Sequence, residues 1–259
     1  MPWFTRALLM ALMTLLGTSA HRATAEPIDV TIATGDYPPY VHNTSPPTGL
    51  LIELVTAVFR DSVYRPKWII TSWPRVEASV QNGQAFGGMP YRRTPEREQI
   101  YNYSSPLYRG GASIFSLRGR LPAFNPKAPS DLIPYRVATP RGYWFEPEFR
   151  RAGVEMYYSN DEVHSFQLLQ RKLADIVVLD TLHGIHLINK HFSDHPQQFS
   201  WSPGLPEDNQ NVDNYMIISR RYPNASAILK QLNDGLQKLR DNGEYTRILQ
   251  RYQDTTTNQ

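Results

Sequence analysis

The residues of this sequence best suited to binding chemistry are the arginines of the stretch G-G-M-P-Y-R-R-T-P-E-R. Thr94 is a favourable helix N-cap, and Pro95 suits the first helical position. They place Arg97 in the first turn of a helix, where unpaired N–H groups favour a carboxylate over a cation. A cation is explained there if guanidinium and N–H groups together bind an anion. Alternatively, Arg97 is solvated or pairs with Glu96 or Glu98.

Four histidines offer a second kind of chemistry, and the sequence contains His183, His186, His191 and His195. The first two share a face of a helix, which suggests zinc ligation. The segment, however, predicts an exposed helix, no H-E-x-x-H motif occurs, and the chain has no cysteine. A nucleophile elbow, a phosphate loop and a dinucleotide fingerprint are also missing from the sequence. We therefore expect no catalytic residues, no metal and no cofactor.

The first 25 residues are typical of a signal peptide. Arg6 supplies the positive charge, and the apolar run Ala7 to Leu16 is too short to span a membrane. Small residues follow, so we expect cleavage after Ala25, with Ala20 as the alternative. The mature protein is therefore predicted to be exported, and without an anchor it would be retained in a periplasm.

Charge and cysteine content exclude several partners and modifications. The full chain has a net charge of +3, and removal of Arg6 and Arg22 with the signal peptide leaves +3 − 2 = +1. The mature charge therefore gives no reason to expect nucleic acid as a partner. With no cysteine, the chain can form neither a disulfide nor a lipidated cysteine anchor. We expect a soluble monomer.

The first half of the mature chain predicts a parallel α/β sheet. Apolar residues alternate or recur at helical spacing in the order strand, helix, strand, helix, strand. The expected ranges are 28–33, 50–59, 68–71, 73–80 and 85–87. Ligands bind beyond the carboxyl ends of such strands, where residues 36–40 and 89–97 would face one crevice.

The second half repeats the α/β pattern after a long strand at 107–117 and a proline-rich, basic passage at 119–134. The expected elements are a strand at 136–139, a helix from 145, a strand at 155–158, a helix at 163–169 and a strand at 175–179. After an irregular stretch at 202–213 the chain is predicted to end with a strand at 215–218 and helices at 228–239 and 245–252. The middle of the chain therefore predicts a second lobe.

Several motifs together resemble the family 3 extracytoplasmic solute-binding proteins, the periplasmic receptors of polar amino-acid ABC transporters. They are Y-P-P-Y at 37–40, G-L-L-I-E-L at 49–54, Trp73 with Asn82-Gly83, T-P-E-R at 94–97, Y-S-S-P-L-Y at 103–108, Arg141-Gly142, A-D-I-V-V-L-D at 174–180 and N-G-E-Y at 242–245. Their joint order covers nearly the whole mature chain.

The resemblance implies an α/β type II periplasmic-binding-protein fold with two lobes. Each lobe would have a mostly parallel sheet flanked by helices, and two hinge strands would join the lobes. The first lobe would be discontinuous, with residues 26–112 and 214–259, and the second would comprise residues 113–213.

Carried over by position, the resemblance assigns Arg97 to the α-carboxylate of the ligand and Asp180 to its α-ammonium. These two groups would lie on opposite lobes and bind a zwitterion best when the lobes close. The alternative for Asp180 is an ordinary N-cap of the following helix. The resemblance also places Tyr37, Tyr40 and Trp73 in the walls of the side-chain pocket, unless they are core aromatics.

This chain departs from the family pattern at positions near the expected ligand. Met89, Pro90 and Arg92 stand where the family often has small hydroxyl residues. After Gly142 the chain has Tyr143 and Trp144 in place of Ser or Thr. Arg92 could supply a second anion contact, and the aromatic side chains suggest an aromatic, cyclic or less polar ligand.

The resemblance predicts a non-enzymatic receptor that closes on a small amino-acid-like or carboxylated solute and delivers it to ABC transporter membrane subunits. One alternative is an enzyme similar to cyclohexadienyl dehydratase on the same fold. In that enzyme, Asp180 would be a general acid, and Arg92 with Arg97 would hold two carboxylates. Another alternative is a sensor module that presents its closed state to a membrane partner.

Overall fold

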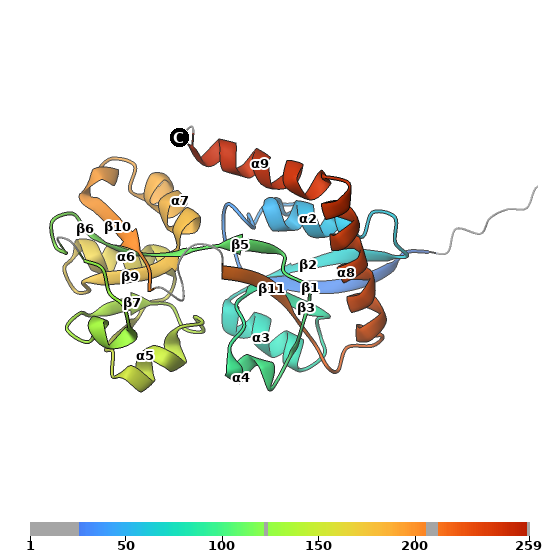
Figure 1. The fold of residues 1–259 in the computed structure, drawn as a ribbon, viewed down its shortest axis with the longest axis horizontal. Coiled ribbons are helices and arrows are strands. Elements are labelled where there is room, and N and C mark those ends of the chain that lie inside the picture. Colours follow the sequence, from blue (N-terminus) through green and yellow to red (C-terminus); the bar gives the residue numbers. More distant parts are fainter. Residues whose placement is uncertain (1–25, 122–123, 206–211, 258–259) are drawn as a thin grey trace, which may run out of the picture.

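The computed structural model describes residues 26–121, 124–205 and 212–257, and of residues 253–257 it describes the backbone alone. The predicted signal peptide lies outside the described residues. The chain forms two lobes side by side, each built on its own sheet (Figure 1). None of the described helices has the length and apolar character that crossing a membrane requires.

The sheet of the first lobe has the strand order β2-β1-β3-β11-β4, with β5 paired to β11. β1 runs parallel to β2 and β3, whereas β11 runs antiparallel to β3, β4 and β5. The strands are β1 Ile28–Thr34, β2 Tyr64–Ile70, β3 Gly87–Tyr91, β4 Asn102–Tyr103, β5 Tyr108–Gly110 and β11 Val212–Ile218.

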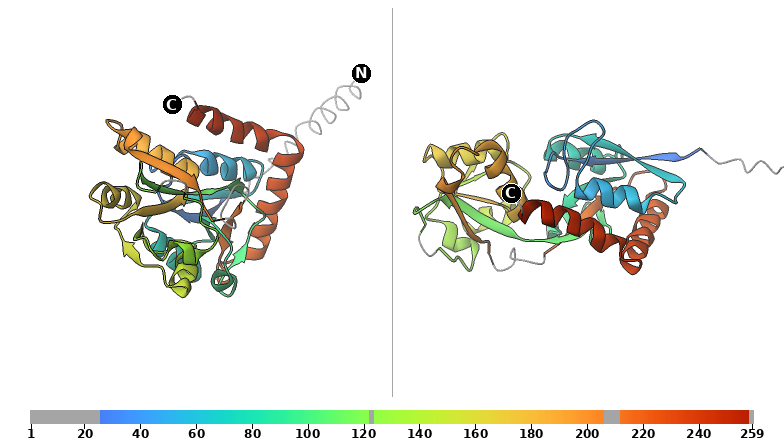
Figure 2. Two further views of the ribbon diagram at one scale, coloured as in Figure 1. Left: turned by 60° about the vertical axis from the view of Figure 1, so that its left-hand side comes forward. Right: turned by 90° about the horizontal axis from the view of Figure 1, so that it is seen from above.

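Helices cover both faces of this sheet, and they are α2 Leu50–Val58, α3 Trp73–Gln81, α4 Pro95–Glu98, α8 Ala225–Asp241 and α9 Glu244–Thr257. One hydrophobic cluster lies beneath α2, α8 and α9 and a smaller one beneath α3, whereas the short α4 buries no side chain. In α8, Ile228, Leu232 and Leu236 recur at helical spacing and are buried. The two last helices follow β11 in the chain, and α9 turns back along the first lobe toward the junction of the lobes (Figure 2).

The sheet of the second lobe has the order β10-β6-β9-β7-β8, with parallel pairs on both sides of β7 and antiparallel pairs on both sides of β6. Its strands are β6 Ala112–Leu117, β7 Val137–Thr139, β8 Met156–Tyr158, β9 Ile176–Asp180 and β10 Phe199–Pro203. The helices are α5 Glu146–Ala152, α6 Glu162–Gln170 and α7 Thr181–His191, with 3-10 turns at Pro129–Leu132 and Pro196–Gln198.

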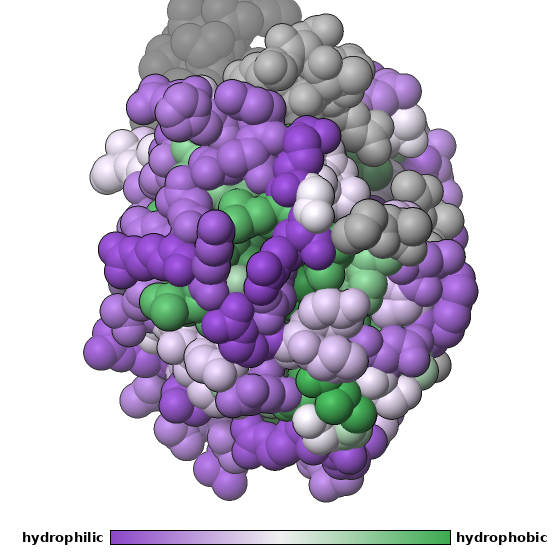
Figure 3. Space-filling model, turned by 90° about the vertical axis from the view of Figure 1, so that its left-hand side faces the viewer, coloured by the Kyte–Doolittle hydropathy of each residue, from purple (hydrophilic) through white to green (hydrophobic). Residues whose placement is uncertain are grey.

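The second lobe has a separate, aromatic-rich core. Phe115, Phe149 and Phe166 are fully buried in it together with the apolar face of β9. The outer end of this lobe is mainly hydrophilic, and hydrophobic side chains form only small separate areas on that face (Figure 3). Because each lobe buries its own core, the site between the lobes need not supply the main hydrophobic stabilisation.

The predicted two-lobe α/β fold is confirmed, with four local differences. The sheets are mixed, because the strands that carry the chain between lobes run against their neighbours. The predicted long strand at 107–117 is two strands, β5 and β6, in different sheets. The edge strand β10 is not among the predicted elements: its last two residues fall in the stretch 202–213 that is expected to be irregular, although its F-S-W-S pattern alternates.

The fourth difference concerns β3, which begins at Gly87 and continues to Tyr91, whereas the prediction placed the strand at 85–87. Gly87 and Gly88 contribute no side chains to an alternating pattern, so the period of this strand is hidden. Met89 consequently lies within the strand, and its side chain is 0% exposed in the first core.

Gly184 is predicted to be essential for the packing of α7 on the second sheet. A Cβ at this position would lie 2.2 Å from a ring atom of Phe115. Although alanine is the better helix former, overpacking should make Gly184→Ala destabilising by about 1–3 kcal/mol. Chemical denaturation would measure the change in the free energy of unfolding.

The double variant Gly184→Ala with Phe115→Leu is the control for this steric explanation. If the clash is responsible, Gly184→Ala should cost less in the Phe115→Leu background than in the wild type. Equal costs in the two backgrounds would contradict it.

Candidate functional site

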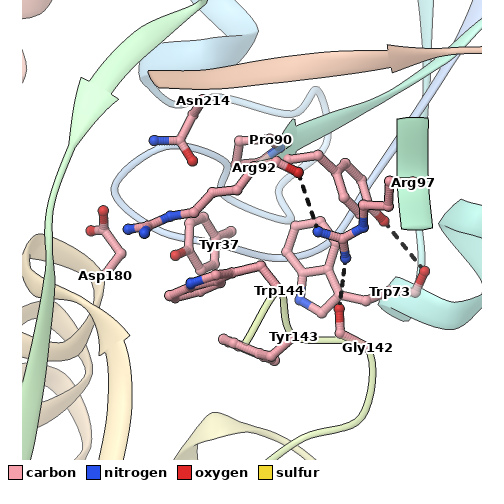
Figure 4. Close-up of a pocket in the computed structure, with 11 residues that line it drawn as sticks. Tyr37, Trp73, Pro90, Arg92, Arg97, Gly142, Tyr143, Trp144, Asp180 and Asn214 are labelled. Carbon is pink, nitrogen blue, oxygen red and sulfur yellow. Dashed lines mark hydrogen bonds between the residues drawn. The ribbon is translucent and has the colours of Figure 1, made fainter. Parts of the chain in front are cut away.

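A small cavity of about 50 Å³ lies between the two lobes. From the first lobe, its lining residues come from the turn after β1, from α3, from the segment between β3 and α4, and from β11 (Figure 4). From the second lobe, they come from the turn before α5 and from the end of β9. They are Tyr37, Trp73, Pro90, Tyr91, Arg92, Arg97, Gly142, Tyr143, Trp144, Asp180 and Asn214. Both lobes therefore contribute charged and aromatic side chains to one site.

Arg97 begins its helix as the sequence predicts, because the Thr94 hydroxyl accepts a hydrogen bond from the Arg97 N–H at 3.3 Å. Its guanidinium turns toward the other lobe and donates to the carbonyl oxygen of Gly142 at 2.9 Å (Figure 4). The same Nη2 donates to Glu77 Oε1 at 2.8 Å. Among the described residues, Arg97 thus forms its ion pair with Glu77 of α3 and not with Glu96 or Glu98 of its own helix, the partners that the alternative named.

Asp180 ends β9 and caps α7. Its Oδ1 accepts a hydrogen bond from the His183 N–H at 3.1 Å, so Asp180 is the N-cap of α7, as the alternative interpretation proposed. The carboxylate also reaches the first lobe, where the Tyr40 hydroxyl lies 3.0 Å from Oδ1 and 3.2 Å from Oδ2. Burial raises the pKa of the Asp180 carboxyl, whereas the His183 N–H and the Tyr40 hydroxyl lower it.

The Y-P-P-Y turn after β1 carries the aromatic side chains that meet Asp180. The Tyr40 ring is stacked between Tyr37, with ring centroids 5.5 Å apart, and Tyr108, at 4.5 Å. Burial raises the pKa of the Tyr37 and Tyr40 hydroxyls, so both remain neutral hydrogen-bond donors. Trp73 meets Tyr37 edge to face at 5.6 Å.

Arg92 follows β3 and extends along the cavity toward Asp180 (Figure 4). It is only 6% exposed, and its guanidinium carbon lies 4.2 Å from the ring centroid of Trp144. This cation–π contact joins the first lobe to the second. Its positive charge also acts on Asp180, where it is one of the smaller influences that lower the pKa of the carboxyl.

The turn before α5 positions the second-lobe wall of the cavity. Gly142 has φ +90°, a left-handed conformation that glycine adopts without strain. Its N–H and that of Tyr143 both donate to Oε1 of Glu146, which holds the turn in place. The Gly142 carbonyl consequently points across the cleft toward Arg97.

The first two histidines of α7 are placed differently from the prediction, since the N-terminal half of this helix packs against the first lobe, whereas His191 at its end is exposed. His183 is 1% exposed, its ring lies tilted against Tyr37 with centroids 4.1 Å apart, and its Nδ1 lies 2.6 Å from the Pro38 carbonyl oxygen. His186 lies edge to face with His42 of the first lobe at 5.8 Å. Within the described ranges, no three His, Cys, Asp or Glu side chains gather in a way that could hold a metal ion.

Most of the predicted site residues meet at this cavity. Eight line it, namely Arg97, Asp180, Tyr37, Trp73, Arg92, Gly142, Tyr143 and Trp144. Tyr40 lies behind Asp180 and is hydrogen-bonded to it. Met89 is the exception, because the longer β3 turns its side chain into the core and away from the lining.

Sequence reasoning missed four residues that shape the site. Glu77 lies one helical turn after Trp73, so the predicted helix already placed both on one face. Tyr91 and Asn214 line the cavity, and Tyr91 packs beneath the Arg97 guanidinium at 4.7 Å. The position of His183 had no local signal, because its contacts come from the other lobe.

Sequence comparison supports the resemblance. The family model of the bacterial extracellular solute-binding proteins, family 3, matches residues 30–255. No curated protein sequence matches the chain.

Solved structures of similar fold cover most of the chain. A Salmonella typhimurium periplasmic binding protein with high arginine specificity has a TM-score of 0.69 and 18% identity, covering 87% of this chain and 99% of that chain. The GluR0 ligand-binding core of Nostoc punctiforme, in complex with L-glutamate, has a TM-score of 0.69, 21% identity and coverage of 86% and 98%. A substrate binding protein of an amino acid ABC transporter has a TM-score of 0.69, 15% identity and coverage of 86% and 98%.

The contact between His42 and His186 predicts a loss of stability in acid. Burial, followed by the charges of His42 and nearby cations, lowers the pKa of His186 from 6.5 to about 4. Between these values the unfolded chain binds a proton that the folded chain does not, so stability falls as the pH falls through this window. Thermal melting at pH 7 and pH 5 should therefore show a smaller loss for His186→Gln than for the wild type.

His195→Gln is the matched control, because His195 is exposed and outside this contact. It should lose as much stability in acid as the wild type. If His186→Gln behaves like His195→Gln, the buried histidine is not responsible for the acid sensitivity.

Proposed function

Because the chain belongs to the bacterial extracellular solute-binding proteins, family 3, we propose that it captures a small amino-acid-like or carboxylated solute between its lobes. As a member of this family it is a solute-binding protein and not an enzyme. The family match and the structural likenesses contain nothing in favour of the cyclohexadienyl dehydratase alternative.

One observation carries the proposal, namely that Arg97 and Asp180 from opposite lobes line the same cavity. The Arg97 guanidinium uses three of its five N–H groups on Glu77, Gly142 and the Arg92 carbonyl. Its Nε–H and one Nη1–H have no partner among the described residues. Each of these two N–H groups can donate a hydrogen bond to an oxygen of a ligand carboxylate.

Lobe closure is the proposed means of capture. The hydrogen bonds from Arg97 to Gly142 and from Tyr40 to Asp180 join residues of different lobes, so they form only in a closed conformation. A solute that bridges the lobes adds contacts to the same conformation and shifts the population toward it. We propose that the lobes pivot near residues 110–112 and where the chain returns to the first lobe, with lobe boundaries near 112/113 and 213/214.

The family is extracytoplasmic, and we propose the periplasm as the specific location, reached through a signal peptide at residues 1–25. An ABC importer is the proposed membrane partner, in line with the structural likeness to an amino acid ABC transporter's substrate binding protein. The protein would act as a monomer. A sensing role for the closed state is the other possible use of the same site.

A thermal-shift panel of amino acids and small carboxylic acids tests the proposed capture. A solute at one hundred times its dissociation constant should stabilise the protein by about 2.7 kcal/mol. Arg97→Ala should weaken binding of that solute by about tenfold to a hundredfold, since a charge-assisted hydrogen-bond pair is lost. Isothermal titration calorimetry would measure the dissociation constants.

Arg93→Ala is the matched control, because Arg93 is half exposed and stacks on Tyr103 and Tyr215 outside the cavity. It should bind the solute as the wild type does. If no member of the panel shifts the melting temperature, or if a folded Arg97→Ala binds as tightly as Arg93→Ala, the proposed function is wrong.

A further inference from the structure

Asp180 already receives hydrogen bonds from the protein at both carboxylate oxygens. The Tyr40 hydroxyl lies within hydrogen-bond distance of both, and the His183 N–H donates to Oδ1. Asp180 is only 4% exposed, and the backbone of Gly110 packs so closely that a Cβ there would lie 2.9 Å from Oδ2. A ligand group can therefore approach this carboxylate only from the cavity.

The guanidinium of Arg92 lies on that cavity side. Figure 4 shows the side chain extending toward Asp180 above the indole of Trp144. The contact with Trp144, at 4.2 Å, and the near-complete burial of Arg92 hold the cation in this position. A ligand ammonium at Asp180 would thus be brought next to a like charge among largely buried side chains, which is unfavourable.

A ligand carboxylate in this cavity would lie next to the positive charge of Arg92, which is favourable. Arg92 and Arg97 are five positions apart in the sequence, and both line the cavity. Arg97 keeps its Nε–H and one Nη1–H without a partner among the described residues. These groups lie on different edges of the guanidinium, so each can donate a single hydrogen bond to a carboxylate oxygen. Tyr143 and Trp144 stand where the family pattern has Ser or Thr. They contribute aromatic rings, and neither offers the small hydroxyl group that could bind an ammonium.

The remaining walls are aromatic. Tyr37, Trp73, Tyr91, Tyr143 and Trp144 all line the cavity. Trp73 lies edge to face with both Tyr37 and Tyr91, at 5.6 and 5.7 Å. Rings in this arrangement pack best against a flat or cyclic apolar body.

We infer that the solute is an aromatic or cyclic carboxylic acid without an α-ammonium group, with Arg92 and Arg97 as its carboxylate-binding residues. This inference rests on the proposed function and names the solute class of the same site. Asp180 then serves to position Arg92 and to join the lobes through Tyr40.

Paired probes that differ only in the ammonium group test the inference by isothermal titration calorimetry on the mature protein. The pairs are hydrocinnamate with L-phenylalanine, indolepropionate with L-tryptophan, and cyclohexylacetate with cyclohexylglycine. In at least one pair the amino-free acid should bind, and at least about tenfold more tightly than its amino counterpart. Arg92→Gln should bring the two affinities of that pair to within a few-fold, whereas Arg93→Gln should leave their ratio unchanged.

The wild-type ratios decide the inference even if Arg92→Gln fails to fold. If, in every pair that binds, the amino acid binds as tightly as the amino-free acid or more tightly, the solute class is wrong but the proposed function stands. A folded Arg92→Gln that keeps the wild-type ratio overturns the role of Arg92. If no pair binds while another acid of the wider panel does, the aromatic or cyclic class is wrong and the proposed function stands. Failure of the whole panel overturns both.

Discussion

The structure depends on one constraint, the burial of a carboxylate at the junction of two separately folded lobes. Asp180 lies at the end of β9, where it both begins α7 and receives the Tyr40 hydroxyl from the other lobe. A buried charge is costly unless hydrogen bonds satisfy it, and the Tyr40 hydroxyl reaches this carboxylate only when the lobes are together. Lobe closure and the stabilisation of the Asp180 charge therefore depend on the same contact between the lobes.

The other features of the site follow from this requirement. The Y-P-P-Y turn must bring Tyr40 to Asp180, and it also packs Tyr37 against His183. Arg92 brings a positive charge to the cavity side of the carboxylate, and the turn at Gly142 offers a carbonyl to Arg97. The site thus uses aromatic stacking and hydrogen bonds between lobes in place of the small hydroxyl groups that the family pattern leads one to expect.

The sequence predicted what local patterns encode. The helical spacing of α2 and α8 and the capping of α4 by Thr94 needed no distant partner, and the family motifs placed Arg97 and Asp180 in one cleft. The glycines of β3 hid its period, which led to the wrong expectation for Met89. The burial of His183 and the pairing of Arg97 with Glu77 could not be predicted, because they depend on how separate elements pack. Asp180 could be assigned both as a cap and as a cleft residue, and the structure shows how one side chain does both.

A crystal structure of the protein with the acid that binds it most tightly tests the central claim most directly. The account predicts closed lobes, with the solute carboxylate within hydrogen-bond distance of the Arg97 guanidinium and Asp180 still bonded to the Tyr40 hydroxyl. A solute bound outside the interlobe cavity, or one bound inside it without contact to Arg97, would contradict the account.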